Sequence, residues 1–359
     1  MTPWPLPPGS TIGLLGGGQL GRMLALAAAR LGFDVAVLEP EPDAPAARVA
    51  AHAITAAYDD PAALSSLAAR AAVVTYEFEN VPAAAVERLV DLGVEVAPGA
   101  RALAVAQDRL AEKTFLNAHG VATVAFAAAD SAEAAAAAVA GVGAPVLMKT
   151  RREGYDGKGQ RWVEHAADAP AAYRALGNVP VIVEAPADFV RELSIICARG
   201  RDGGFAVYPL AENHHGDGVL RRSLAPALAS PVLLAQAERI AAQILSGLDY
   251  VGVMGIELFE LRDGSLLVNE IAPRVHNTGH WTQDGCPVDQ FEQHIRAIAG
   301  WPLGPTAASC GVEMINLLGD DARDWLRWAA EPDTRLHLYG KRDAKPGRKM
   351  GHVNRLRPL

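Results

Sequence analysis

The sequence predicts an α/β protein that begins with a doubly wound parallel sheet and ends in a small β-rich unit. Over the first hundred residues, short apolar runs alternate with helix-like stretches, which is typical of a parallel sheet covered by helices. A second α/β region contains a hairpin with an Asp-Gly turn signal, and short strands dominate the remainder. Because 359 residues exceed one ordinary core, we expect an N-terminal α/β domain at 1–100, a central domain at 101–300 and a β-rich domain at 301–359.

The elements of the first domain follow in order. Its predicted strands lie at 11–15, 34–38, 73–75 and 94–96, and Pro98-Gly99 ends the domain.

The central domain is expected to divide into subdomains of about 101–178 and 179–300. We expect helices at 100–118, 232–246 and 288–299, and an Ala-rich helix near 132–140. Predicted strands lie at 145–149, 180–184, 189–198 and 204–210, followed by a hairpin at 253–271. The β-rich end has predicted strands near 312–317, 335–339 and 349–353.

Charge and composition exclude some classes of function. The net charge is −8 with no long basic block before the last thirty residues, so no nucleic-acid partner is expected. The N-terminus resembles neither a signal peptide nor a membrane span. Cys197, Cys286 and Cys310 are scattered and form no CxxC motif, so we expect reduced thiols in the cytoplasm.

Lysine is rare in this chain. Six lysines stand beside twenty-seven arginines, and all except Lys113 fall in two segments, 149–158 and 341–349. Because lysine and arginine bind phosphate with different geometry, these segments are candidate anion sites.

A glycine-rich turn follows the first strand. Residues 16–21 fit G-x-G-x-x-G, and Glu39 ends the next strand, where a dinucleotide-binding fold has a ribose-binding acid. The pattern is weak by itself. It is compatible with a dinucleotide, with a role toward another substrate, or with close packing alone.

The hairpin carries facing acids. If Asp263-Gly264 forms a two-residue turn, Glu257 lies opposite Glu270 and Leu258 opposite Asn269. Two carboxylates about 5 Å apart repel by roughly 3 kcal/mol at an effective dielectric near 20. A divalent cation resolves this repulsion, and oxygen ligands suit Mg²⁺ bound with nucleotide phosphates. A one-residue register shift, a shared proton or a neighbouring arginine are the alternatives.

A polar loop rich in glycine follows the strand that ends at Lys149. Residues 151–160 contain three glycines and Lys158, so the backbone can fold over a ligand and present N–H groups to phosphate. The Walker A spacing is absent, and a solvated loop is the alternative. We expect this loop to act as a mobile lid.

Together, the strand lysine, the glycine loop and the Glu…Asn-Glu hairpin resemble the ATP-grasp fold. Several stretches are more specific and resemble the N5-carboxyaminoimidazole ribonucleotide synthase family: 17–23, 154–160, 208–215, 272–282 and 346–352, of which His276-Asn-Thr-Gly-His-Trp-Thr282 is the most distinctive. The resemblance covers nearly the whole chain. It implies a cytoplasmic, homodimeric ligase of purine biosynthesis that uses ATP and Mg²⁺ to join bicarbonate to 5-aminoimidazole ribonucleotide through carboxyphosphate, releasing ADP and phosphate.

The resemblance also implies roles for individual residues. Glu257 and Glu270 are expected to bind the metal. The expected catalytic residues are Lys149, Tyr155, Asp156, Lys158, Arg274 and His276. The expected ATP-binding residues are Arg109, Lys149, Gly154, Tyr155, Asp156, Gly157, Lys158, Gly159, Gln160, Glu184, Ala185, Pro186, Ala187, Glu192, His215, Asn269 and Glu270. The expected ribonucleotide-binding residues are Gln19, Leu20, Glu77, Tyr155, Asp156, Arg274, His276, Asn277, Lys341, Arg348 and Lys349.

Three other functions remain to be distinguished. They are a formate-dependent glycinamide ribonucleotide transformylase of the same fold, a nucleotide-dependent oxidoreductase suggested by residues 16–21, and a non-catalytic nucleotide sensor.

Overall fold

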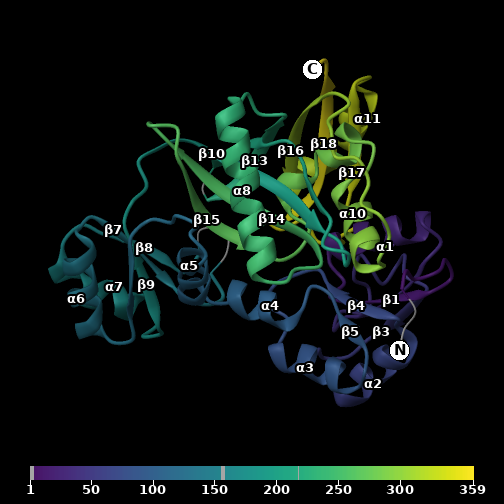
Figure 1. Cartoon of the computed structure of the whole chain (residues 1–359), viewed down its shortest axis with the longest axis horizontal. Coiled ribbons are helices and arrows are strands. Elements are labelled where there is room, and N and C mark those ends of the chain that lie inside the picture. The colour runs from purple at the N-terminus through teal and green to yellow at the C-terminus, as the bar shows by residue number, and fades with distance from the viewer. Residues whose placement is uncertain (1–3, 155–157, 217) are drawn as a thin grey trace.

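The computed structural model describes residues 4–154, 158–216 and 218–359, and the chain folds around three sheets (Figure 1). The first sheet is parallel throughout, in the order β3-β2-β1-β4-β5. Its strands are β1 (Thr11–Leu15), β2 (Asp34–Leu38), β3 (His52–Ile54), β4 (Val73–Tyr76) and β5 (Glu95–Val96). Helices α2 (Pro61–Arg70) and α3 (Ala83–Asp91) pack on one face, and α1 (Gln19–Arg30) covers the other. The predicted doubly wound N-terminal domain is confirmed.

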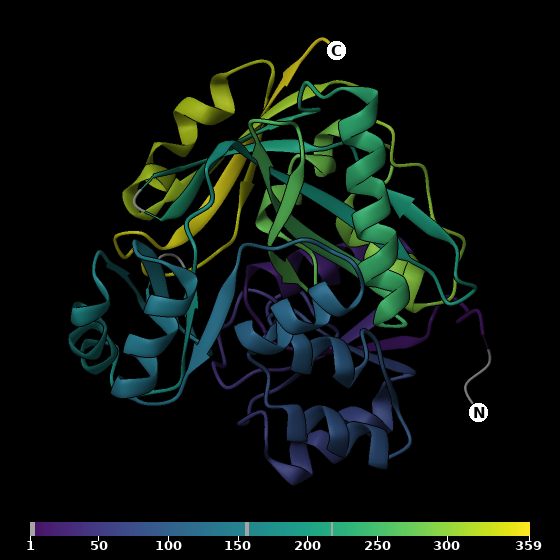
Figure 2. The ribbon, with the colours of Figure 1, turned by 60° about the vertical axis from the view of Figure 1, so that its left-hand side comes forward.

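A small antiparallel sheet stands apart from the others, as the turned view shows (Figure 2). Its order is β6-β9-β7-β8, and α6 and α7 share its apolar core. The bounds are β6 (Phe126–Ala129), β7 (Val146–Thr150), β8 (Gln160–Val163), β9 (Val181–Glu184), α6 (Ala132–Val142) and α7 (Ala169–Ala175). Lys149 stands next to the end of β7, where it faces residues of the large sheet.

The large sheet has the order β15-β14-β10-β12-β13-β16-β18-β17, with β11 paired to β10. The predicted C-terminal strands are present, and they extend this sheet through the antiparallel pair β13–β16. Helix α8 (Pro231–Gly247) packs on one face, and α10 (Gln290–Ile298) packs on the other and against α1. The strands are β10 (Phe189–Arg199), β11 (Phe205–Val207), β12 (Ala211–Gly216), β13 (Val219–Ala225), β14 (Gly252–Leu261), β15 (Leu266–Ala272), β16 (Gly311–Leu318), β17 (Thr334–Leu338) and β18 (Lys349–Arg357).

The single helix predicted for 100–118 is wrong, because the chain breaks it into α4 (Ala100–Ala106) and α5 (Arg109–Ala118). Asp108 causes the restart, since its Oδ1 accepts hydrogen bonds from the N–H groups of Leu110 and Ala111 at 3.0 and 3.4 Å. The same carboxylate pairs with Arg151 at 2.7 Å, which ties the start of α5 to the glycine-rich loop. The elements that were not predicted are strands β3, β6, β8, β12 and β13 and helices α7, α9 (Thr282–Gly285) and α11 (Trp325–Ala330).

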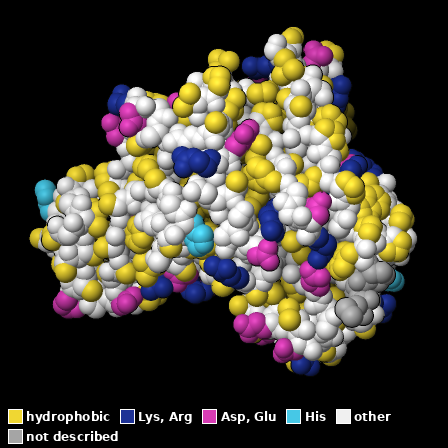
Figure 3. Space-filling view, viewed as in Figure 1, with side chains coloured by type: hydrophobic (Ala, Val, Ile, Leu, Met, Phe, Trp, Pro, Cys, Tyr) yellow, Lys and Arg dark blue, Asp and Glu magenta, His cyan; other side chains and the backbone are white. Residues whose placement is uncertain are grey.

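The surface agrees with the acidic composition. On the face shown in Figure 3, lysine and arginine side chains are scattered among acidic and apolar ones. Within the described part of the chain, every helix is too short or too polar to cross a membrane.

Candidate active site

A cavity of about 390 Å³ opens where the small sheet, the large sheet and the N-terminal domain meet. Cations, carboxylates and neutral polar groups line it together with the apolar Leu147, Leu220 and Phe259. Its lining includes Glu79, Arg109, Lys149, Gly154, Lys158, Gln160, Glu192, His215, Glu257, Asn269, Glu270, Arg274, His276, Asn277 and Lys349. The structure thus brings together most of the predicted site residues from segments far apart in the sequence.

The two hairpin acids face each other across β14 and β15, although the predicted turn is wrong. Leu261 and Ser265 close the turn, so the loop has three residues, with Gly264 at φ 79°. That shifts the register by one residue, and Leu258 pairs with Val268 rather than with Asn269. A β-bulge at Asn269 restores the register, so that Glu257 pairs with Glu270 as predicted.

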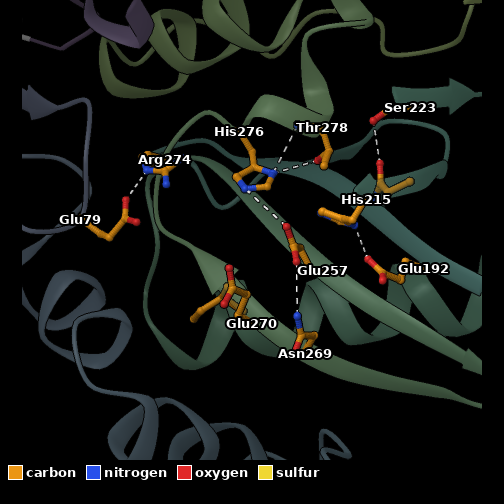
Figure 4. Close-up of polar contacts among 12 residues, drawn as sticks. Glu79, Glu192, His215, Ser223, Glu257, Asn269, Glu270, Arg274, His276 and Thr278 are labelled. Atoms are coloured by element: carbon orange, nitrogen blue, oxygen red, sulfur yellow. Dashed lines mark hydrogen bonds and ion pairs between the residues drawn. The ribbon is translucent and has the colours of Figure 1, made fainter. Parts of the chain in front are cut away.

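The environments of these carboxylates differ (Figure 4). Burial, reinforced by the charge of Glu270, raises the pKa of Glu257 to about 7. Burial also acts on Glu270, but the Arg109 guanidinium, 3.0 Å from its Oε2, lowers the pKa of Glu270 overall. Asn269 Nδ2 donates to Glu257 at 3.3 Å, and His276 Nε2 lies 3.7 Å from Glu257. Because Glu257 pairs with Glu270, the alternative in which a register shift places the two acids on opposite faces is excluded. The alternative of a neighbouring arginine does apply to Glu270.

Predicted ATP-binding residues lie on both sides of the cavity. On the small sheet, Lys149 Nζ contacts Glu184 at 2.7 Å. Across the cavity, His215 Nδ1 contacts Glu192 at 2.5 Å. Burial would lower the pKa of His215, but the Glu192 carboxylate outweighs it, so that pKa is raised. Glu184 itself is buried behind the cavity wall, and the main chain of Ala185 donates to Ala125. Glu184, Ala185, Pro186 and Ala187 are not among the described residues that line the cavity.

Arg274 and His276 lie at the N-terminal-domain side of the cavity. Arg274 Nε donates to Glu79, a residue that sequence reasoning missed. Burial would raise the pKa of Glu79, but the Arg274 cation outweighs it and lowers that pKa to about 2. Burial and the charge of Arg274 lower the pKa of His276 to about 3, so its imidazole is neutral, with Nδ1 2.8 Å from Thr278 Oγ1. Both amide atoms of Asn277 are buried, and neither has a hydrogen-bond partner among the residues that the structure describes. Such orphaned groups are typical of a ligand site.

The glycine-rich turn at the start of α1 does not resemble an open dinucleotide site. Glu77 accepts hydrogen bonds from the N–H groups of Gly18 and Gly21 at 2.5 and 2.7 Å. Glu39 accepts from Gly17 N and from the hydroxyl of Tyr58, both at 2.6 Å. The chain's own carboxylates therefore occupy the N–H groups that a pyrophosphate would need, which argues against a dinucleotide.

A second hollow, of about 260 Å³, adjoins this turn and is lined by Gln19, Glu77, Lys341 and Arg348. Burial and the charge of Arg348 lower the pKa of Lys341 to about 8. Lys349 follows Arg348 in sequence but lines the first cavity, so the predicted phosphate cluster divides between the two hollows. Leu20 is buried in the apolar core, so its side chain contributes to packing.

Tyr155, Asp156 and Gly157 lie outside the described residues, so their predicted roles stay predictions. Sequence reasoning also missed Glu112 on α5, which is 2% exposed, and burial raises its pKa to about 8 despite the charge of Lys113. In the sequence, Glu112 and Lys113 read as ordinary residues of a helix, so no pattern indicated that they are buried.

Comparisons with known proteins agree with this geometry. Models of the ribonucleotide synthetase preATP-grasp domain, the ATP-grasp domain and the phosphoribosylaminoimidazole carboxylase C-terminal domain match residues 10–107, 114–291 and 313–358. The N5-carboxyaminoimidazole ribonucleotide synthases of Brucella melitensis and Pseudomonas aeruginosa are 51% and 46% identical to this chain, covering 98% and 95% of it and 98% and 93% of their own lengths.

Solved structures are similar over nearly the whole chain. An ADP complex of an N5-carboxyaminoimidazole ribonucleotide synthetase has a TM-score of 0.94 at 40% identity, covering 99% of this chain and 94% of its own. The Aspergillus clavatus N5-carboxyaminoimidazole synthase with ADP and 5-aminoimidazole ribonucleotide has a TM-score of 0.91 at 32% identity, covering 98% and 95%.

Proposed function

The chain belongs to the N5-carboxyaminoimidazole ribonucleotide synthase family of ATP-grasp ligases, and from this premise we propose how its residues perform the reaction. The enzyme carboxylates 5-aminoimidazole ribonucleotide in purine biosynthesis at the expense of ATP. The observation that carries the residue assignment is a single cavity that joins phosphate-binding cations, facing carboxylates and the Arg274-His276-Asn277 group.

ATP lies between the small and the large sheet. Lys149, Lys158 and Arg109 contact its phosphates, because cations neutralise charge on a transferring phosphoryl group. Glu192 accepts hydrogen bonds from the ribose hydroxyls. The adenine extends beyond the described lining of the cavity, to the main chain of 184–187 that follows β9. Support comes from the position of Lys149 at the cavity wall opposite Glu192 and His215.

Glu257 and Glu270 fit a magnesium ion. They face each other at one register position, and burial together with mutual repulsion raises the pKa of Glu257. Two carboxylates plus nucleotide phosphates are a common ligand set for Mg²⁺. When bound, the metal supplies charge neutralisation at the phosphates.

Bicarbonate reacts next to Arg274. A bicarbonate oxygen attacks the γ-phosphorus, the bond to the ADP oxygen breaks, and carboxyphosphate forms. The exocyclic amine of the ribonucleotide then attacks the carboxyl carbon, or carbon dioxide released from it, and phosphate leaves while the amine loses a proton. Carboxyphosphate is unstable in water, so water must be excluded from the cavity while it forms. Arg274 holds the anion, and the leaving phosphate takes the proton of the amine. His276, whose pKa is about 3, stays neutral and acts as a hydrogen-bonding group beside Arg274.

The ribonucleotide spans the two hollows. Its 5′-phosphate is held by Lys341 and Arg348 beside Gln19, and its base reaches Asn277 and Arg274. Glu77 supports this path, because it lines the second hollow and interacts electrostatically with both Arg274 and Lys341.

The remaining assignments follow the same premise. We divide the chain at about residues 100 and 300 and place it in the cytoplasm, where its three free cysteines fit a reducing compartment. A homodimer is supported by the exposed apolar Leu228 and Val232 before and within α8, and analytical ultracentrifugation tests it.

Release of ADP tests the function. We expect ADP release to require both bicarbonate and 5-aminoimidazole ribonucleotide. Dependence on formate and glycinamide ribonucleotide would indicate the transformylase, nucleotide binding without turnover would indicate a sensor, and a redox reaction of a dinucleotide would indicate an oxidoreductase.

A further inference from the structure

The outer edge of β15 is covered by side chains of α5. In the described part of the chain this strand is at the end of the large sheet, so its outward main-chain groups bond to loops and side chains, as Val268 N does to Ala122 O at 2.9 Å. Glu112 Oε1 accepts a hydrogen bond from Ile271 N at 2.6 Å, and Lys113 Nζ donates to Asn269 O at 3.2 Å. The two main-chain groups on either side of Glu270 are therefore held by consecutive residues of one helix.

The same helix also holds the side chain of Glu270. Arg109, one turn before Glu112 and Lys113, contacts Glu270 Oε2 at 3.0 Å and donates to Gly154 O at 3.3 Å. Residues three and four apart lie on one helical face, so all three side chains reach the bulge together. We call Arg109, Glu112 and Lys113 the α5 clamp.

Such a clamp is costly if it only covers a strand edge. Glu112 and Lys113 are 2% and 1% exposed, and burying charged groups carries a large desolvation penalty. Neutral side chains or water could satisfy the same two main-chain groups. The use of a buried lysine and of a buried carboxyl group, whose pKa burial raises to about 8, indicates that the position of the bulge matters for more than covering the strand edge.

The clamp is also connected to the cavity lysine. Lys113 Nζ lies 3.4 Å from Glu184 Oε1, and Lys149 Nζ lies 2.7 Å from Glu184 Oε2. Lys113, the lysine that lies outside the two lysine-containing segments, is thus placed between Glu184 of the small sheet and the bulge of the large sheet.

We propose that Glu112 and Lys113 are positioning residues that fix the bulged backbone around Glu270, so that its carboxylate faces Glu257 before ligands bind. Lys113 also orients Lys149 through Glu184. This inference rests on the proposed function, because it takes Glu270 as a ligand of the metal that accompanies ATP.

Calorimetric titration of ADP with and without Mg²⁺ tests the proposal without turnover. We expect Mg²⁺ to increase ADP affinity in the wild-type protein, and Lys113→Met to reduce this increase at least tenfold. If Lys113 acts through Glu270, Lys113→Met has no further effect in a Glu270→Gln background, since the two changes then share one interaction. Arg239→Met, an exposed cation on α8, is the matched control and should behave as wild type.

Glu112 is tested by rescue. Glu112→Gln keeps an oxygen that can accept from Ile271 N and should retain the Mg²⁺ effect within about threefold, whereas Glu112→Ala should lose it. Equal behaviour of these two variants, or an unchanged Mg²⁺ effect in folded Lys113→Met, overturns the proposal.

Two outcomes separate this inference from its premise. If Glu270→Gln keeps the full Mg²⁺ effect, the metal assignment itself fails. If Glu270→Gln removes it but Lys113→Met does not, only the clamp fails. Should Lys113→Met not fold, hydrogen exchange of the ligand-free wild-type protein decides: we expect slow exchange at Ile271 N–H, and exchange as fast as in the 262–264 turn contradicts a preformed clamp.

Discussion

Arg348→Ala separates ribonucleotide binding from nucleotide binding. The main chain at Arg348 is held independently, since its carbonyl accepts from Gly319 N at 2.8 Å. Its Nη1 donates to the carbonyl of Asp343 at 3.1 Å, and its side chain lines the second hollow with Lys341. Truncation should therefore remove an anion contact and leave the fold intact.

The magnitude follows from the contact that is lost. A hydrogen bond to a charged group contributes about 1.5–3 kcal/mol, which corresponds to roughly ten- to a hundredfold in affinity. We expect the KM for 5-aminoimidazole ribonucleotide to rise by about that factor and the KM for ATP to change by less than about twofold. Steady-state kinetics in which each substrate is varied in turn measures both constants.

The control is Arg323→Ala, which removes an exposed arginine paired with Asp320 at 3.1 Å and should leave both constants unchanged. Lys349→Ala should affect both constants, because Lys349 lines the shared cavity. Equal effects of Arg348→Ala on both substrates, or no effect on either, would refute the assignment of the phosphate to this hollow.

Three further predictions concern the metal, pH and stability. Glu270→Gln should reduce ADP release about a hundredfold or more while circular dichroism stays unchanged, because a metal contributes several kcal/mol of charge stabilisation; near-normal activity at limiting Mg²⁺ would contradict it. The pKa of Lys341 is about 8, and only its protonated form attracts phosphate, so kcat/KM for the ribonucleotide should be full below pH 8 and fall above it, and Lys341→Gln should abolish this fall. Glu79→Ala leaves Arg274 without its carboxylate and should lower the free energy of unfolding by about 1.5–3 kcal/mol in urea denaturation; the exposed Glu87→Ala should change it by less than about 0.5 kcal/mol.

The hairpin shows how far sequence reasoning reaches. The Asp-Gly signal located the turn, but it did not fix the loop length. A glycine at positive φ, as Gly264 is, fits both a two-residue and a three-residue loop. The predicted pairing of Glu257 with Glu270 is confirmed only because the bulge at Asn269 compensates the longer loop. That bulge is held by Glu112 and Lys113, more than 150 positions away in the chain, so no local pattern could indicate it.

The rest of the site divides in the same way. Strands, the facing acids and the glycine loop follow from periodicity and residue type, so they were predictable. The Arg274–Glu79 pair and the occupation of the α1 turn by Glu77 depend on contacts between segments about 195 and 59 positions apart. The Arg274–Glu79 pair is set by the packing of the N-terminal domain against the large sheet, and the Glu77 contact by the pairing of β1 with β4. Local sequence encodes neither.

Transfer of labelled oxygen tests the central claim most directly. With ¹⁸O-bicarbonate, ATP and 5-aminoimidazole ribonucleotide, carboxyphosphate formation predicts that each phosphate released carries one oxygen from bicarbonate, because that oxygen attacks the γ-phosphorus. Mass spectrometry of the phosphate reports the label. Phosphate that takes its new oxygen from water instead would contradict the proposed activation of bicarbonate.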